Sequence, residues 1–424
     1  MRLNYTSYRS KKLFCFLLSL LTILNGYAFF FAGTFSIGMM IATVYALAGV
    51  FKLFTRNNAK GIFYSPILLL IFFIMLTLLS VASLYTSQIH YSALLYDIAK
   101  IGVWATMISL AGYFYFDYKI FAKYIIRVAV VATVLLIAQV IAITFLKISI
   151  PNAFDLGIIR PAYIDYGYSI DHLASQIRLS SFWMEPAQYG NYILAALAIG
   201  LFDINTQIRH RKLTICLFVF GILLSTSSGA IYMMLIFFML YFLRSNAKNK
   251  IIVIFILTVS LCAVFIFSNF SMLEQISGMG KLGYSVYRAL TKIELWRDSA
   301  RIGASFDVIS SLSDYGIHKY IGLGVGNEIE LLNSINREFT YLNSFAKTVT
   351  WTGYFGVMAY IMFFVSLIRR NRTNRIGRVL SIFCFIGGFY SGLWYSPDSI
   401  VFYIIAIYSI KKSSMVSPEA DHNS

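Results

Sequence analysis

Charged residues and cysteines are scarce in this chain of 424 residues. Only 12% of its residues are charged and 59% are hydrophobic, whereas an average soluble domain has ~25% charged residues. The four cysteines, Cys15, Cys216, Cys262 and Cys384, all lie within apolar stretches. This placement excludes a disulfide framework and a cysteine metal motif. The composition is that of a membrane protein.

Acidic residues are also few, and the formal net charge is +17. Such a surplus can indicate nucleic-acid binding, but here the lysines and arginines are dispersed between apolar segments and form no single basic face. We therefore expect no nucleic-acid partner. The two loop histidines, His172 and His318, are too far apart in the sequence to suggest a metal site, and we expect neither a metal nor a cofactor.

Long apolar runs dominate the sequence. A bilayer core of ~30 Å requires about 20 apolar residues per helix, and that criterion predicts an all-α, polytopic integral membrane protein with about twelve transmembrane helices. The predicted spans are 13–31, 34–53, 62–84, 93–116, 124–146, 187–203, 213–226, 228–243, 251–269, 344–368, 379–396 and 399–410.

Basic residues set the predicted orientation. With the N-terminus inside, the cytoplasmic segments hold more than half of the 35 lysines and arginines, and the short outer loops 32–33, 85–92 and 397–398 hold none. This agrees with the positive-inside rule. Merging the seventh and eighth spans across Ser225–Gly229 would place the Arg369–Arg378 cluster outside, so we keep twelve spans and place both termini in the cytoplasm.

Two outward loops are too long to be simple connections, and they divide the chain. The predicted order is helices one to five, the first large loop, helices six to nine, the second large loop, and helices ten to twelve with a cytoplasmic tail. These parts cover 1–146, 147–186, 187–269, 270–343 and 344–424.

Arginine is concentrated in these outward loops, where positive charge is normally depleted. The first loop has Arg160 and Arg178, and the second has Arg288, Arg297, Arg301 and Arg337. A guanidinium group matches the oxygens of phosphate, so the cluster suits a lipid diphosphate. The alternative is a solvated helix in which Arg297 and Arg301, on one helical face, pair with neighbouring carboxylates.

Two further segments carry polar groups next to predicted spans. Glu185 precedes Pro186 at the start of the sixth span. A carboxylate there either interacts favourably with the helix dipole or acts as a general base. Asp307 and Glu328 are the other candidate bases. The glycine-rich segment Gly322–Asn327 lacks the strand-then-helix context of a dinucleotide loop, so we predict a tight turn that uses the backbone freedom of glycine.

Several short motifs resemble the O-antigen polymerase and ligase superfamily of polytopic enzymes, of the Wzy type. The resemblance covers about Arg178 to Phe364 and rests on RLSSFWMEPAQYG (Arg178–Gly190), LSTSSGA (Leu224–Ala230), Arg301 ahead of GLGVGN (Gly322–Asn327), Asn343, and WTGYFG (Trp351–Gly356).

Two departures from the family pattern separate its branches. Leu342 stands where the ligases typically have a histidine before the asparagine, and Ser228 stands where an arginine is frequent. The first departure, together with the Glu185-Pro186 pair, favours the polymerase branch.

The resemblance implies a fold similar to the glycosyltransferase C architecture and an enzyme that polymerises undecaprenyl-diphosphate-linked oligosaccharide repeat units. It implies that Glu185, Arg178 and Arg301 are catalytic, with Glu185 as the general base and the arginines at the diphosphate. The substrate-binding residues would be Arg160, Arg288, Arg297, Tyr189 and Asn343.

The expected location is the bacterial inner membrane, with the active site facing the periplasm. The expected partners are the lipid-linked oligosaccharide, the bilayer and a chain-length regulator protein. An O-antigen ligase and a polysaccharide flippase or small-solute transporter are the alternatives. Transport requires polar or charged residues within the spans and shorter outer loops. The clearest charge within a predicted span is Arg127, which lies near the inner end of its helix and can snorkel to the cytoplasm, so the sequence favours an enzyme over a transporter.

Overall fold

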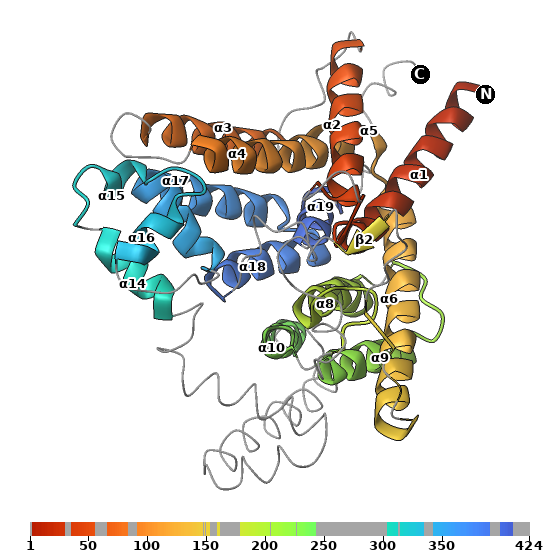
Figure 1. Cartoon of the computed structure of the whole chain (residues 1–424). Helices are drawn as coiled ribbons and strands as arrows, with labels where there is room; N and C mark the ends of the chain where they lie inside the picture. The colour runs from red at the N-terminus through yellow and green to blue at the C-terminus, as the bar shows by residue number, and fades with distance from the viewer. Residues whose placement is uncertain are drawn as a thin grey trace, which may run out of the picture.

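The computed structural model describes most of the membrane-type segments and parts of both long loops. The described residues are 2–29, 35–55, 66–83, 91–146, 148, 150–152, 159–161, 179–203, 205–225, 227–242, 303–312, 314–334, 342–390 and 399–409. Within them the chain is mainly helical, which confirms the predicted all-α class (Figure 1). The sheet in this part is a single antiparallel pair, β1 (Tyr27–Phe29) with β2 (Ile159–Pro161).

The described residues up to 146 form mainly long helices, with one π-helical segment between α4 and α5 and another after α6. They are α1 (Arg2–Leu24), α2 (Ile37–Thr55), α3 (Pro66–Ser83), α4 (Tyr91–Thr106), the π-helix η1 (Met107–Ala111), α5 (Gly112–Tyr115), α6 (Tyr118–Ile141) and the π-helix η2 (Ala142–Leu146). The start of α6 is set by Asp117, whose side chain accepts a hydrogen bond of 3.2 Å from the Ile120 amide. Such an N-cap satisfies one of the amides that a helix start leaves open.

The remaining helices come from the middle and the end of the chain. They are α8 (Pro186–Phe202), α9 (Arg211–Leu224), α10 (Ser228–Phe242), α14 (Gly303–Leu312), α15 (His318–Ile321), α16 (Glu328–Ser334), α17 (Ser344–Arg370), α18 (Arg375–Tyr390) and α19 (Ile400–Tyr408). Because α9 ends at Leu224 and α10 begins at Ser228, the seventh and eighth predicted segments are separate helices.

Four helices in the described part are both long and apolar enough to cross a membrane: Ile37–Thr55, Leu95–Tyr115, Tyr118–Ile141 and Ser344–Arg370. The predicted segment 251–269 lies outside the described residues. Every other predicted span overlaps a helix, but twelve crossings stay a prediction, because only these four meet both criteria.

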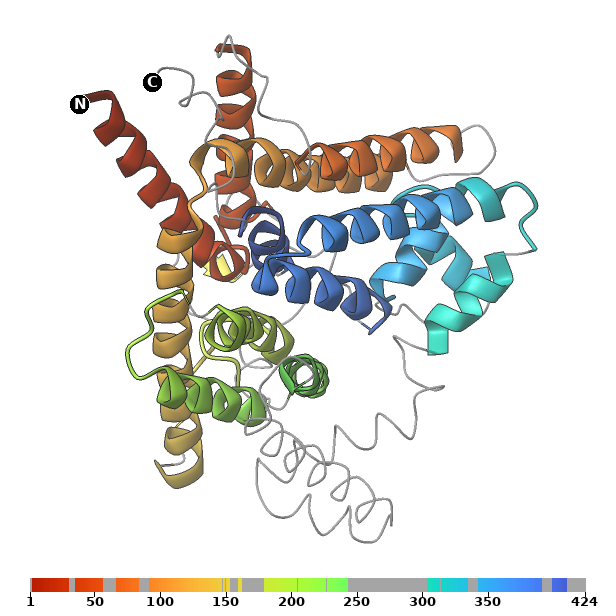
Figure 2. The ribbon, with the colours of Figure 1, turned by 180° about the vertical axis from the view of Figure 1, so that it is seen from behind.

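The apolar helices expose large hydrophobic side chains, as expected for helices that contact lipid. On α2 the exposed residues include Val44, Leu47, Phe51 and Phe54. In Figures 1 and 2, α2 and α6 run roughly along one direction, whereas α3, α4 and α17 run across it. The helices are therefore not arranged as one simple parallel bundle.

Helix α8 lies at the centre of the fold, between α6, α9, α10 and α18. Its residues are buried along almost the whole length, which requires small side chains at the close crossings. A Cβ atom on Gly190 would lie 2.4 Å from the Cβ of Ala230 in α10. Close approach of α8 and α10 therefore depends on glycine at this position.

A second, smaller apolar cluster joins the end of the second long loop to α17. It comprises Ala304, Val308, Leu312, Leu323, Leu331, Leu332, Leu342, Ala346 and Val349. Helices α14, α15 and α16 gather beside the N-terminal half of α17, and Figure 2 shows them from behind. The described part of the 270–343 loop is thus folded against the helices.

Candidate functional site

Glu185 occupies the N-cap position of α8. Its backbone is extended (φ −129°, ψ 144°), and Pro186 begins the helix. This confirms the predicted place of Pro186 in the first turn. The Glu185 side chain is exposed and makes no capping hydrogen bond. A carboxylate in this position is available to an external proton donor, and its negative charge is favourable at a helix N-terminus.

The residues just before Glu185 are held in place by buried hydrogen bonds to α6. The Gln139 side chain donates to the Ser181 carbonyl at 3.3 Å and accepts from the Ser181 amide at 3.0 Å. Gln139 also donates to Asn152, which in turn accepts from the Ser180 amide at 3.1 Å. A buried glutamine fully engaged in this way fixes the turn on the helix.

The turn itself carries backbone strain. Ser181 has a φ of 59°, in the left-handed region that disfavours residues with a side chain. The Trp183 amide donates to the Ser180 carbonyl, and the Trp183 indole donates to Thr22 of α1 at 3.2 Å. Contacts with both α1 and α6 therefore maintain a conformation that costs about 1–2 kcal/mol at one residue.

Other predicted site residues are placed as follows. The Tyr189 side chain is fully buried in the core, where its hydroxyl is 3.0 Å from the Thr133 hydroxyl. Arg160 lies in β2, opposite Ala28. Arg178, Arg288, Arg297 and Arg301 lie outside the described residues.

Asn343 is the N-cap of α17. Its side chain accepts from the Ala346 amide at 2.8 Å and donates to the Phe389 carbonyl at 2.9 Å. Its own amide donates to the Ser305 hydroxyl at 3.4 Å. These bonds join the start of α17 to α14 and to the end of α18, so Asn343 has a structural role. None of these three bonds involves Glu185 or Tyr189.

A buried ion pair lies at the start of α16 and α17. The ammonium group of Lys347 is 2.8 Å from the Glu328 carboxylate, and both side chains are largely buried, at 15% and 10% exposed. The Trp351 indole donates to the second carboxylate oxygen at 2.6 Å. The Lys347 ammonium also lies 5.1 Å from the centre of the Trp351 ring, within the range of a cation–π interaction.

This ion pair favours the charged form of Glu328. Burial alone would raise its pKa, but the adjacent Lys347 ammonium and the hydrogen bonds from Lys347 and Trp351 stabilise the charged form, so the pKa is lowered overall. A general base also needs an oxygen that the substrate can reach. Glu185 is exposed and Glu328 is buried, so Glu185 fits that role better than Glu328.

The glycine-rich segment docks on a break in α17. Gly353 interrupts this helix with a φ of 59°. The Leu323 amide donates to the Thr350 carbonyl at 2.7 Å, and the Gly324 amide donates to the Trp351 carbonyl at 3.0 Å. Backbone carbonyls that a break releases need such partners, above all in a membrane protein.

The predicted glycine angles are confirmed in this segment, because Gly322, Gly324 and Gly326 all have positive φ. Its flanking elements are the short helices α15 and α16, and neither is a strand. The Val325 amide further donates to Ser80 of α3 at 3.3 Å. The segment thus joins α3 to the break in α17.

Lys347 and Gln139 were not predicted as site residues, and Trp351 entered only as the first residue of the WTGYFG motif. A signal was present for the first two: Lys347 is a charge, and Gln139 a long polar side chain, within predicted spans where an uncompensated polar group is costly. The partner of Lys347 lies 19 residues earlier in the chain, in the second long loop, so the pairing itself was not readable from spacing.

No model of a known protein family matches the chain, and no curated protein is significantly similar to it.

Proposed function

We propose that this protein polymerises undecaprenyl-diphosphate-linked oligosaccharide repeat units in the bacterial inner membrane, with its active site facing the periplasm. The observation that carries the proposal is the exposed carboxylate of Glu185, held at the start of the central helix α8 by a strained, hydrogen-bonded turn. Strain maintained by surrounding contacts is typical of functional sites. The turn directly follows Arg178 in the sequence, within the segment that resembles the polymerases.

The proposed reaction is a glycosyl transfer without a nucleotide sugar. The acceptor hydroxyl of one lipid-linked repeat unit attacks the anomeric carbon of the growing chain, and the bond from that carbon to the diphosphate oxygen breaks. Glu185 takes the proton of the hydroxyl. The diphosphate leaves with the bonding electron pair, and Arg178 and Arg301 stabilise its negative charge. The transition state resembles an oxocarbenium ion, as in other glycosyl transfers.

Binding of the diphosphate and the glycans is assigned to the arginines Arg160, Arg288 and Arg297. Tyr189 and Asn343, which were also expected at the substrate, are buried and hydrogen-bonded, and in this proposal they position α8 and α17 around it. A chain-length regulator protein is the proposed protein partner. Both termini are placed in the cytoplasm, so a reporter fused at about residue 374 should give a cytoplasmic signal; a periplasmic signal would contradict this orientation.

A strain that lacks this protein tests the function directly. On gels of surface polysaccharide, loss of a polymerase leaves single repeat units, and the wild-type protein restores long chains. Arg178→Lys keeps the charge but loses the planar donor fork, so we expect normal protein levels with single repeats. Polymer that accumulates on the carrier would indicate a ligase, and absence of all surface glycan would indicate a flippase; either result rejects the proposal.

A further inference from the structure

A segment rich in arginine, residues 369–378, connects α17 to α18. It contains no lysine, and its basic residues are Arg369, Arg370, Arg372, Arg375 and Arg378. No acidic residue occurs between Glu338 and Asp398, so this part of the sequence supplies no counter-charge. The positive-inside rule makes no distinction between lysine and arginine. The exclusive use of arginine therefore indicates recognition by the planar donor fork of the guanidinium group.

Most of these arginines are accessible to an external anion. Four of them have exposed side chains: Arg369, Arg370, Arg372 and Arg375. Within the described part of the chain none of the four forms an ion pair. Arg375 and Arg378 are three residues apart on α18 and so share one side of this helix. Because α18 begins at Arg375, the positive end of its dipole adds to the attraction for an anion.

Arg378 gives the clearest indication of a bound acceptor. Its side chain is half-buried, and its Nε atom is buried without a hydrogen-bond partner among the described residues. A buried donor normally has a partner, and a guanidinium group withdrawn from water needs a counter-charge. A phosphate group meets both needs, because its oxygens accept hydrogen bonds and its charge is negative.

The segment is held in place by hydrogen bonds of its own asparagines. The buried Asn371 side chain donates to the Ser381 hydroxyl at 3.1 Å and to the Ala406 carbonyl at 2.7 Å. The Asn374 side chain donates to the Ser409 hydroxyl at 2.7 Å. These bonds attach the segment to α18 and to the end of α19. A site that is organised in advance loses little conformational entropy when it binds.

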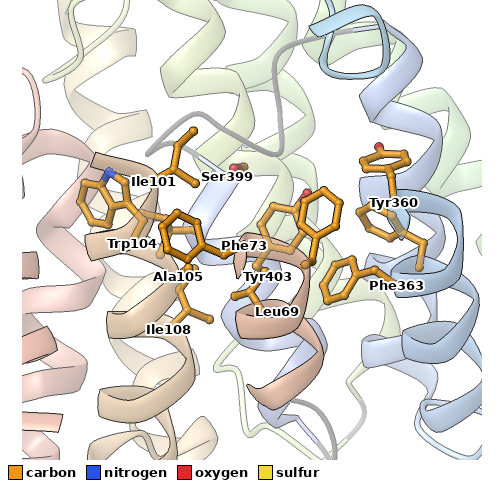
Figure 3. Close-up of a pocket in the computed structure, with 13 residues that line it drawn as sticks. Leu69, Phe73, Ile101, Trp104, Ala105, Ile108, Tyr360, Phe363, Ser399 and Tyr403 are labelled. Atoms are coloured by element: carbon orange, nitrogen blue, oxygen red, sulfur yellow. The ribbon is translucent and has the colours of Figure 1, made fainter. Parts of the chain in front are cut away.

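The three helices around the segment are also packed against each other. Tyr360 of α17 and Tyr403 of α19 line the same small apolar pocket (Figure 3), and the rings of Phe364 and Tyr403 are 6.2 Å apart. Helix α18 contacts α19 through Phe383 and Phe402, whose ring centres are 4.8 Å apart. The arginines therefore project from a firm base of three helices.

We propose that the segment 369–378 binds the phosphate of an anionic phospholipid headgroup. Helix α17 is long and apolar enough to cross a membrane, and it ends at Arg370, so the segment lies at the level of the headgroups. Basic sites between membrane helices bind lipids of this kind. The proposal does not depend on the proposed polymerase activity.

Native mass spectrometry of the purified full-length protein in detergent measures this binding. The probe is phosphatidylglycerol, and the comparison is phosphatidylcholine with the same acyl chains, whose headgroup has no net charge. We expect the wild type to bind phosphatidylglycerol about tenfold more tightly. Arg375→Gln/Arg378→Gln should lower the phosphatidylglycerol affinity about tenfold. Arg378→Lys keeps the charge but loses the donor fork, and it should also bind this lipid more weakly.

Two further variants separate the possible results. Lys12→Gln/Lys212→Gln removes two exposed positive charges elsewhere and should keep the wild-type affinity. Arg372→Gln/Arg375→Gln changes only exposed side chains, so it should fold normally and still bind phosphatidylglycerol more weakly. Equal affinity for the two lipids, wild-type affinity in the arginine variants, or an equal loss in the lysine control would overturn the proposal. Because no glycan is present, none of these results bears on the polymerase activity.

Discussion

The Glu328–Lys347 ion pair provides a quantitative test of how the second long loop is attached to the helices. Lys347→Met keeps the length of the side chain but removes its charge. Glu328 then stays largely buried, with a hydrogen bond from Trp351 but without the ammonium group that lies 2.8 Å away in the wild type. Removing one partner of a buried ion pair typically destabilises a protein by about 3–5 kcal/mol.

We expect a loss of about 3 kcal/mol for Lys347→Met, at the low end of the range because the pair retains some exposure. Glu328→Gln should also destabilise, since it leaves the buried Lys347 without its counter-charge. The double variant should be less destabilised than the sum of the two single variants. In the double variant the amide oxygen of the substituted side chain still accepts from the Trp351 indole, and neither substituted side chain carries a charge.

The assay is denaturant unfolding of the purified protein in detergent, followed for the wild type, both single variants and the double variant. Lys212→Met is the matched control, because this lysine is exposed; its effect should stay within about 0.5 kcal/mol. Additive effects in the double variant, or a Lys347→Met variant as stable as the control, would refute the role given to the ion pair.

Three further predictions concern pH, the helix break and the turn before Glu185. The pKa of Glu328 is lower in the folded than in the unfolded state, so the folded state binds its proton more weakly. The stabilisation by the ion pair is therefore present above the unfolded pKa of about 4.3 and is lost as the pH falls through the lower folded pKa. An unchanged difference in stability between the wild type and the double variant from neutral to acidic pH would contradict this. Gly353→Ala should destabilise the protein more than Gly316→Ala in thermal unfolding. Both glycines have positive φ, but only a Cβ at Gly353 would lie 2.4 Å from the Tyr320 backbone. Equal effects would argue against close packing of α15 on the break in α17. Gln139→Leu should cost about 1–3 kcal/mol by leaving the buried Ser181 backbone groups without their partner, whereas Val134→Leu on the exposed face of α6 should have little effect.

Helices were the most predictable part of this protein. Apolar runs long enough to cross a bilayer mark helices almost wherever the structure describes them, and Pro186 and the glycines of Gly322–Asn327 adopt the conformations that their chemistry predicts. The break in α17 at Gly353 was not predicted, because the sequence there reads as a continuous apolar helix.

Contacts between distant segments could not be read from the sequence. Gln139 and Ser181 are 42 residues apart, and only the folded chain brings them together. Tyr189 was expected at the substrate, yet its ring points into the core beside Thr133, because periodicity does not distinguish the buried from the accessible face of a helix that is surrounded by other helices. The assignment of the four arginines outside the described residues stays a prediction.

The proposed mechanism depends most on Glu185 as the general base, and one measurement tests this role directly. Purified wild-type protein and Glu185→Gln are incubated with undecaprenyl-diphosphate-linked repeat units, and the rate of chain extension is measured. Because the Glu185 side chain is exposed and makes no capping bond, the variant should fold normally. Loss of a general base predicts a rate about 10²-fold or more below wild type, with Asp307→Asn close to wild type. Chain extension by Glu185→Gln at the wild-type rate would show that Glu185 is not the general base.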